Sequence, residues 1–209
     1  MVARALSNNK RCKAFTGISL NLFNQILKGL EGKFKNSYKM GPEDQLCLFY
    51  FKVKTNLTNG PLATVFVVEE QLVSTIFKHM VNILFEFSKD HLYWLSKSEV
   101  KRTMPKSFRK HFPDVRVIID ATEIRTEIPK SVRAAVLKYS SYKHYHTIKV
   151  LIGIAPCGLI TFMSKAYGGR ISDSQLTVDS GFIEKIRPGD GVMSDKGFPT
   201  IEEDLVKSC

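Results

Sequence analysis

The pattern of hydrophobic and polar positions changes once along the chain, near Pro113. Before it, apolar residues recur at intervals of three and four in "SLNLFNQILKGL" and "QLCLFYFKVKTNL", which is typical of amphipathic helices. Gly41-Pro42-Glu43-Asp44 indicates a helix start, and Thr58-Asn59-Gly60-Pro61 breaks the pattern. A short apolar segment, "LATVF", follows, and the spacing then predicts a longer helix from about Glu69 to Phe87.

A turn between a short helix and a long helix is the outline of a helix-turn-helix unit. Any small helical bundle gives the same pattern, and the pattern alone favours that simpler alternative. The segment "VVEEQ" has no glycine at the turn, and it puts Glu69 and Glu70 at the start of the second helix. Acids there suit the helix dipole but repel DNA phosphates, so base reading by this helix is not expected.

Strand-like segments dominate after Pro113. "VRVIID" predicts a strand that ends at Asp120, and "HTIKVLIGIA" and "LITFMSKAY" predict an antiparallel hairpin around a tight turn. Ser172-Asp173 can cap a helix through about Ile186, and "GVMSD" predicts a short fourth strand that ends at Asp195. The chain is therefore expected to be α+β, with a helical domain over residues 1–95, a basic connector over 96–114, and a domain with a mixed sheet over 115–209.

The charge is strongly basic and unevenly spread. A net charge of +11 favours a polyanionic partner such as DNA. The excess gathers in "KSEVKRTMPKSFRKHFPDVR", which holds seven cations and two acids and leads directly into the first strand. The candidate DNA-contacting residues are Lys101, Arg102, Arg109 and Lys110 from this stretch, and Tyr142, Lys143 and His144 from "SYKHYHT".

Composition excludes several other classes. The contents of hydrophobic residues (44%) and of charged residues (24%) are ordinary for a globular protein and argue against disorder. No apolar run reaches the length of a membrane span, so no membrane partner is expected, and the N-terminus lacks the apolar core of a signal peptide. The four cysteines show no C-x-x-C pattern and are expected to be reduced thiols.

Two aspartates stand out because each is predicted to end a strand. If the strands of Asp120 and Asp195 are neighbours, both carboxylates can hold the divalent ions that assist phosphoryl transfer. The alternative is ordinary, since aspartate is common where a strand ends in a turn. Asp173 is interpreted mainly as a helix cap and only secondarily as a metal ligand. Glu123 is interpreted as a solvated acid that faces Arg125.

Three strings, "PKSFRKHFPDVRVIIDATEI", "YSSYKHYHTIKVLIGIAPCGLITFMSKAYGGRISDSQLT" and "PGDGVMSDKGF", resemble the DDE superfamily endonucleases, the transposase-derived group related to Harbinger and IS5-type elements. Residues from about Pro42 to Trp94 resemble the helix-turn-helix region of these proteins. The resemblance implies a ribonuclease-H-like fold and a DNA endonuclease that uses Mg²⁺ or Mn²⁺ and acts in the nucleus. It makes Asp120 the first catalytic carboxylate and Asp195 the second, and Asp173 matches a recurring acid.

The chain departs from the family in its third catalytic acid, which should lie on a later helix. Glu202, Glu203 and Asp204 stand too near Asp195 in sequence to occupy that helix. We therefore expect a nuclease domain that is truncated at its C-terminus and a chain that does not cleave DNA. A non-catalytic DNA-binding remnant of a transposase is the alternative, and a protein-interaction module is a third. A separate DNA-recognition protein and a homo-oligomer are both left open as partners.

Overall fold

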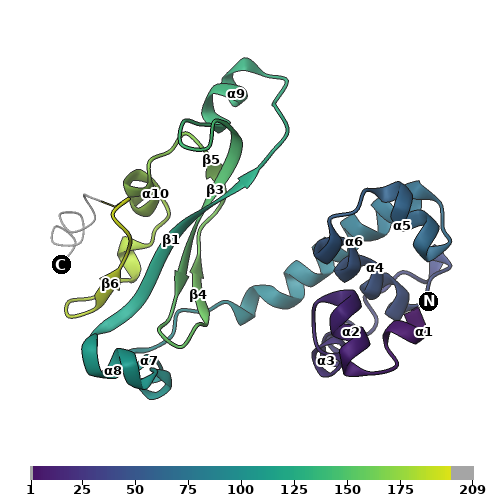
Figure 1. Ribbon diagram of the computed structural model, residues 1–209, viewed down its shortest axis with the longest axis horizontal. Helices are drawn as coiled ribbons and strands as arrows, with labels where there is room; N and C mark the ends of the chain where they lie inside the picture. The colour runs from purple at the N-terminus through teal and green to yellow at the C-terminus, as the bar shows by residue number, and fades with distance from the viewer. Residues whose placement is uncertain (1, 199–209) are drawn as a thin grey trace. The chain divides into compact units, whose positions relative to one another are not determined.

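The computed structural model describes residues 2–198 and divides the chain into two units (Figure 1). The division falls between His91 and Leu92. Residues 96–114, which the sequence predicts as a connector, form two short helices of the second unit.

The first unit is helical throughout its described part. Its elements are α1 (Val2–Ala5), α2 (Asn9–Thr16), α3 (Leu20–Gly29), α4 (Pro42–Thr55), α5 (Asn59–Phe66) and α6 (Glu70–Ser88), with the 3-10 turns η1 (Asn36–Tyr38) and η2 (Lys89–His91). Pro42 occupies the first turn of α4, as its sequence predicts. The apolar stripe of α6 buries Val73, Ile76 and Met80 in the core of this unit. The predicted helices are therefore confirmed.

Helices α5 and α6 meet at 97° through the three residues between Phe66 and Glu70. This angle and turn length are those of a helix-turn-helix unit. Val67 ends α5 with a left-handed backbone (φ 56°), and its side chain is 89% exposed. A β-branched residue is strained in this conformation, which glycine adopts freely. The sequence has no glycine at this turn, and the left-handed position is therefore taken by a valine with a strained backbone.

Within residues 2–198 no single helix is long and apolar enough to span a membrane, and only the bent pair of α5 with α6–η2 meets those criteria. Cys12, Cys47 and Cys157 are free, and Cys209 lies outside the described residues.

The second unit combines short helices with a mixed sheet. Its elements are α7 (Lys97–Thr103), α8 (Lys106–His111), β1 (Val115–Arg125), α9 (Val132–Lys138), β2 (Tyr139–Ser140), β3 (Tyr145–Ile154), β4 (Ile160–Met163), β5 (Tyr167–Gly168), α10 (Asp173–Asp179), η3 (Ile183–Lys185) and β6 (Gly191–Met193). Strand β3 pairs antiparallel with β1, β2, β4 and β5, and β6 joins β1 in parallel. The α+β class is confirmed, and the strand order agrees with a ribonuclease-H-like domain.

Several predicted boundaries are wrong. Strand β1 does not end at Asp120, because the segment from Asp120 to Arg125 keeps pairing with β3, from Ile152 to Thr147. Strand β6 ends at Met193, two residues before the predicted strand end. The predicted third strand is divided into β4 and β5, and the predicted crossover helix is divided into α10 and η3.

The two faces of β3 have different surroundings. Thr147, Lys149 and Leu151 are buried on the face where the core of this unit, with Leu176 and Phe182, is assembled. The alternate residues Ile148, Val150, Ile152 and Ile154 are only half-buried. A lysine and a threonine thus lie among the buried positions of the strand, which directs attention to what contacts them.

Candidate metal and nucleic-acid site

The parallel pairing of β1 and β6 brings the two predicted catalytic aspartates to equivalent positions just beyond the last residue pair of the two strands. Ile118 and Met193 are the last paired residues, and Asp120 and Asp195 each follow two residues later. Both aspartates are exposed. Asp120 Oδ1 accepts a hydrogen bond from the amide of the next residue (2.8 Å). That the two carboxylates share one ion stays a prediction.

Asp195 and Asp173 converge on Gly197. A Cβ atom at Gly197 would lie 2.9 Å from Asp195 Oδ1 and 3.2 Å from Asp173 Oδ2. Gly197 also donates its backbone N–H to Asp195 Oδ1 over 2.9 Å. Because the backbone of Gly197 is not left-handed, glycine serves here to leave space, not to allow an unusual conformation. The space above Gly197 is therefore lined by two carboxylate oxygens from separate elements.

The interpretation of Asp173 as a helix cap is wrong in detail. Ser172 caps α10, and its hydroxyl accepts a hydrogen bond from the amide of Gln175 (3.1 Å). Asp173 is the first residue of the helix, and its side chain is 28% exposed. Since the cap is made by its neighbour, the carboxylate of Asp173 is available for other partners.

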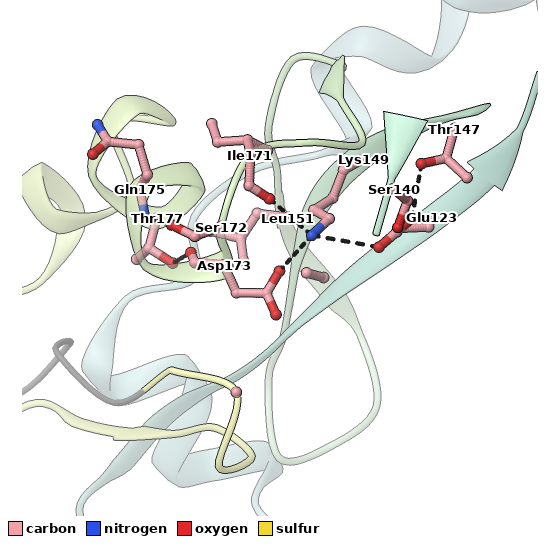
Figure 2. Close-up of polar contacts among 12 residues, drawn as sticks. Glu123, Ser140, Thr147, Lys149, Leu151, Ile171, Ser172, Asp173, Gln175 and Thr177 are labelled. Atoms are coloured by element: carbon pink, nitrogen blue, oxygen red, sulfur yellow. Dashed lines mark hydrogen bonds and ion pairs between the residues drawn. The ribbon is translucent and has the colours of Figure 1, made fainter. Parts of the chain in front are cut away.

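One of those partners is Lys149, which joins three elements (Figure 2). Its ammonium lies 2.9 Å from Asp173 Oδ1, 2.9 Å from the carbonyl oxygen of Ile171 and 3.4 Å from Glu123 Oε1. Only 7% of Lys149 is exposed. Burying an ammonium is costly unless charges and hydrogen bonds compensate it, and here they do.

The interpretation of Glu123 as a solvated acid is also wrong. Its side chain is 5% exposed, and it accepts a hydrogen bond from the hydroxyl of Thr147 (2.7 Å). Burial is the largest influence on the pKa of Glu123 and would raise it. The hydroxyls of Thr147 and Ser140 and the charge of Lys149 outweigh burial, so the pKa lies below its usual value. Arg125 lies instead over the ring of Tyr145.

Sequence reasoning missed Lys149 because "HTIKVLIGIA" was interpreted as a nearly continuous apolar strand. A signal was present. A lysine between isoleucine and valine in a buried strand needs a buried acid beside it. Glu123 and Asp173 were the acids available, and both were assigned to solvent or to a cap.

The basic stretch folds into α7 and α8, and its cations have different environments. The four predicted DNA contacts from this stretch are exposed: Lys101, Arg102, Arg109 and Lys110. Arg109 also donates a hydrogen bond to the Met104 carbonyl (3.0 Å), and two other cations of the stretch are engaged within the protein. Lys97 pairs with Asp190 (3.1 Å), and Arg116 is buried, donates to the Leu95 carbonyl and lies over the ring of Trp94. These last two residues support the fold of this region.

The second predicted DNA contact group lies in the turn between β2 and β3. Tyr142, Lys143 and His144 are all exposed, and the Lys143 ammonium lies 4.6 Å from the centre of the Tyr142 ring. His144 adopts a left-handed backbone (φ 60°) and donates its amide to the Ser140 carbonyl (2.8 Å). Figure 1 shows α7 and α8 at one end of β1 and the α9–β2 region at the other, so the two basic groups are separated by the length of that strand.

In the described part of the chain, Asp120, Asp173 and Asp195 do not belong to a metal-binding cluster of three or more side chains. Within residues 2–198, no three side chains from His, Cys, Asp or Glu are placed to hold one metal ion together. Glu202, Glu203 and Asp204 lie outside the described residues.

Comparison with family models gives two matches. A model described as "DDE superfamily endonuclease" matches residues 119–208, and a model described as "Helix-turn-helix of DDE superfamily endonuclease" matches residues 38–89. The first contains Asp120, Asp173 and Asp195, and the second covers α4, α5 and α6. Comparison with curated proteins and with solved structures gave no significant match.

Proposed function

Because the chain belongs to the DDE superfamily endonucleases, we propose that its second unit binds DNA and holds a divalent cation, Mg²⁺ or Mn²⁺, of the kind that such nucleases use in phosphodiester hydrolysis and strand transfer. The observation that carries this proposal is the parallel pairing of β1 with β6, since Asp120 and Asp195 each follow the last residue pair of the two strands by two residues. The transposase-derived nuclease identity of the family supplies the class of reaction.

The residues present suit a hard cation. Mg²⁺ in proteins is usually held by one or two carboxylates, with waters and substrate phosphate as the other ligands. Asp120 and Asp195 would be the principal ligands, and Asp173 a weaker one, because its Oδ2 faces the space above Gly197. When bound, the ion would supply Lewis-acid stabilisation of charge at the phosphate and a more acidic bound water.

The chain's own groups prepare this site. Backbone amides of Ala121 and Gly197 each hold one oxygen of a neighbouring aspartate, which limits the rotation of both carboxylates. The two basic groups lie at opposite ends of the eleven-residue strand β1, which spans about 33 Å. A duplex that contacts both would therefore pass along β1 for roughly ten base pairs. This path runs past Asp120.

We further propose that the 209-residue chain binds DNA without cleaving it, which agrees with a DNA-binding remnant of a transposase. An in-line displacement with two ions needs ligands that stabilise both the attacking and the leaving oxygen. Two carboxylates converging on Gly197 can position one ion.

A nicking assay tests both parts of the proposal. Supercoiled plasmid is incubated with the chain and Mn²⁺, beside an Asp120→Ala control. We expect DNA retardation without nicking in both proteins. Nicking that depends on Asp120 would contradict the proposed inactivity while supporting the site. Absence of DNA retardation at low salt would contradict the proposed DNA partner.

A nuclear location follows from a DNA partner and is proposed with it. Imaging of a fluorescent fusion tests it, and exclusion of the fusion from the nucleus would contradict it. A homo-oligomer or a separate DNA-recognition protein remains compatible with this function, and the mass of the DNA complex would distinguish them.

A further inference from the structure

We infer that Lys149 is a positioning residue for the cation site: it holds Asp173 Oδ1, so that Asp173 Oδ2 faces Asp195 across Gly197. This inference rests on the proposed function, because it requires that a cation binds at Asp195. It adds a residue that neither the sequence pattern nor the family match assigns.

The contacts of Lys149 are specific. The Lys149 ammonium donates hydrogen bonds to the Ile171 carbonyl and to Asp173 Oδ1, both in the segment that leads into α10, and forms an ion pair with Glu123 of β1. Figure 2 shows its side chain between β1 on one side and the start of α10 on the other. Since Lys149 is buried within β3, it is a fixed point from which the orientation of a more exposed carboxylate can be set.

Asp173 is the group that needs to be fixed. Its side chain is 28% exposed, whereas the side chain of Glu123 is 5% exposed. One of its oxygens is bound to Lys149, and the other lies 3.2 Å from the position of a Cβ at Gly197. Lys149 also binds the Ile171 carbonyl, two residues earlier, which holds the backbone that leads into α10. The lysine thus fixes both the carboxylate and the segment that carries it.

The alternative is a purely structural ion pair. Buried ion pairs can often be replaced by apolar side chains of similar volume with little loss of stability, so stability does not separate the two roles. Cation affinity does separate them. Groups that hydrogen-bond to metal ligands typically contribute ten- to a hundredfold in metal affinity. A structural pair would leave the affinity of the folded protein unchanged or raise it, because Lys149→Met also removes a positive charge close to the cation site.

The experiment measures Mn²⁺ affinity in the full chain from the electron paramagnetic resonance signal of free Mn²⁺. The variants are Lys149→Met, Asp173→Asn and the double variant. We expect Lys149→Met to weaken Mn²⁺ binding about tenfold or more. We expect the double variant to be no weaker than Asp173→Asn alone, because Lys149 acts through Asp173. Circular dichroism below the melting temperature verifies that each protein is folded.

Glu123→Gln is the matched control, because it removes the other acid bound to Lys149 and leaves the contact with Asp173 in place. It should keep Mn²⁺ affinity within about twofold. Unchanged or higher Mn²⁺ affinity in Lys149→Met, or additive losses in the double variant, would overturn the positioning role. Asp195→Asn tests the proposed function separately: if it leaves Mn²⁺ binding unchanged, the assigned site is wrong and the role of Lys149 fails with it. If Asp195→Asn abolishes Mn²⁺ binding but Lys149→Met leaves it unchanged, the proposed site stands and only the inference on Lys149 is overturned.

Discussion

Glu123 and Lys149 are partners in the β1–β3 register, and their charged groups lie 3.4 Å apart on the buried face of the sheet. The surroundings of Glu123 lower its pKa below the usual value despite burial. The ionised form is therefore favoured in the folded chain relative to the unfolded one. This has a consequence for stability at low pH.

We expect Glu123 to contribute stability above the pKa of an unfolded glutamate, about 4.3, and to lose that contribution as pH falls through its folded-state pKa. Trp94 is the one tryptophan of the chain and packs against Phe182, so its fluorescence reports unfolding of the second unit. Urea unfolding followed at Trp94 should show wild type more stable than Glu123→Gln near pH 7. The difference should shrink below about pH 4. A difference that is constant with pH would contradict the prediction.

Val67 provides a test of backbone strain in the helix-turn-helix turn. Its left-handed backbone and exposed side chain mean that Val67→Gly relieves strain and removes little packing. We expect Val67→Gly to stabilise the first unit by about 1 kcal/mol, seen as a higher midpoint of helix melting at 222 nm.

Val53→Gly is the matched control for this change. Val53 is also exposed, but it lies inside α4, where glycine costs roughly 0.5–1 kcal/mol relative to alanine. The same substitution should therefore have opposite signs at the two positions. Destabilisation by both would show that the side chain of Val67 matters more than its backbone.

The helices of the first unit were predictable because their signals are local. The proline in the first turn of α4 and the apolar spacing of α6 each lie within the helix that they predict. The end of β1 was not predictable in the same way. The residues after Asp120 form a strand because they pair with β3, whose residues lie more than twenty positions later in the sequence. A local sequence pattern contains no information on so distant a partner.

The residue types of the candidate site could be proposed from the sequence, but their contacts could not. Asp120 and Asp195 were proposed because each was predicted to end a strand, and their role as metal ligands stays a prediction. Asp173 was assigned to a cap because Ser172-Asp173 offers two capping side chains, and only the fold shows which one binds the helix amide. Lys149 was missed because its acids come from β1 and α10, which the sequence does not place beside it.

Charge reversal in α7 and α8 tests the DNA interface. Glutamate at Lys101, Arg102, Arg109 and Lys110 should weaken binding to duplex DNA at every sequence. It should also flatten the dependence of log K on log salt by about 0.9 for each lost phosphate contact. Fluorescence anisotropy with two unrelated duplexes at several salt concentrations measures both effects.

A control for charge reversal uses exposed lysines of the first unit: Lys10, Lys13, Lys28 and Lys33. Changing these four to glutamate lowers the net charge by the same amount, so a general electrostatic effect would appear in both variants. An equal loss of affinity and of salt slope in the two variants would show that binding depends on overall charge and not on α7 and α8.

Gly197 tests whether the space between the two carboxylates is used. A methyl group there would lie 2.9 Å from Asp195 Oδ1 and 3.2 Å from Asp173 Oδ2, so at least one carboxylate must move. Because the Gly197 backbone is not left-handed, Gly197→Ala adds no conformational strain of its own. We expect it to weaken Mn²⁺ binding about tenfold with a small change in melting temperature.

Gly189→Ala is the complementary control, since Gly189 is left-handed (φ 79°) with open space around its Cβ position. That variant should lower the melting temperature and leave Mn²⁺ affinity unchanged. If Gly197→Ala binds Mn²⁺ as wild type does, the cation does not bind between Asp173 and Asp195.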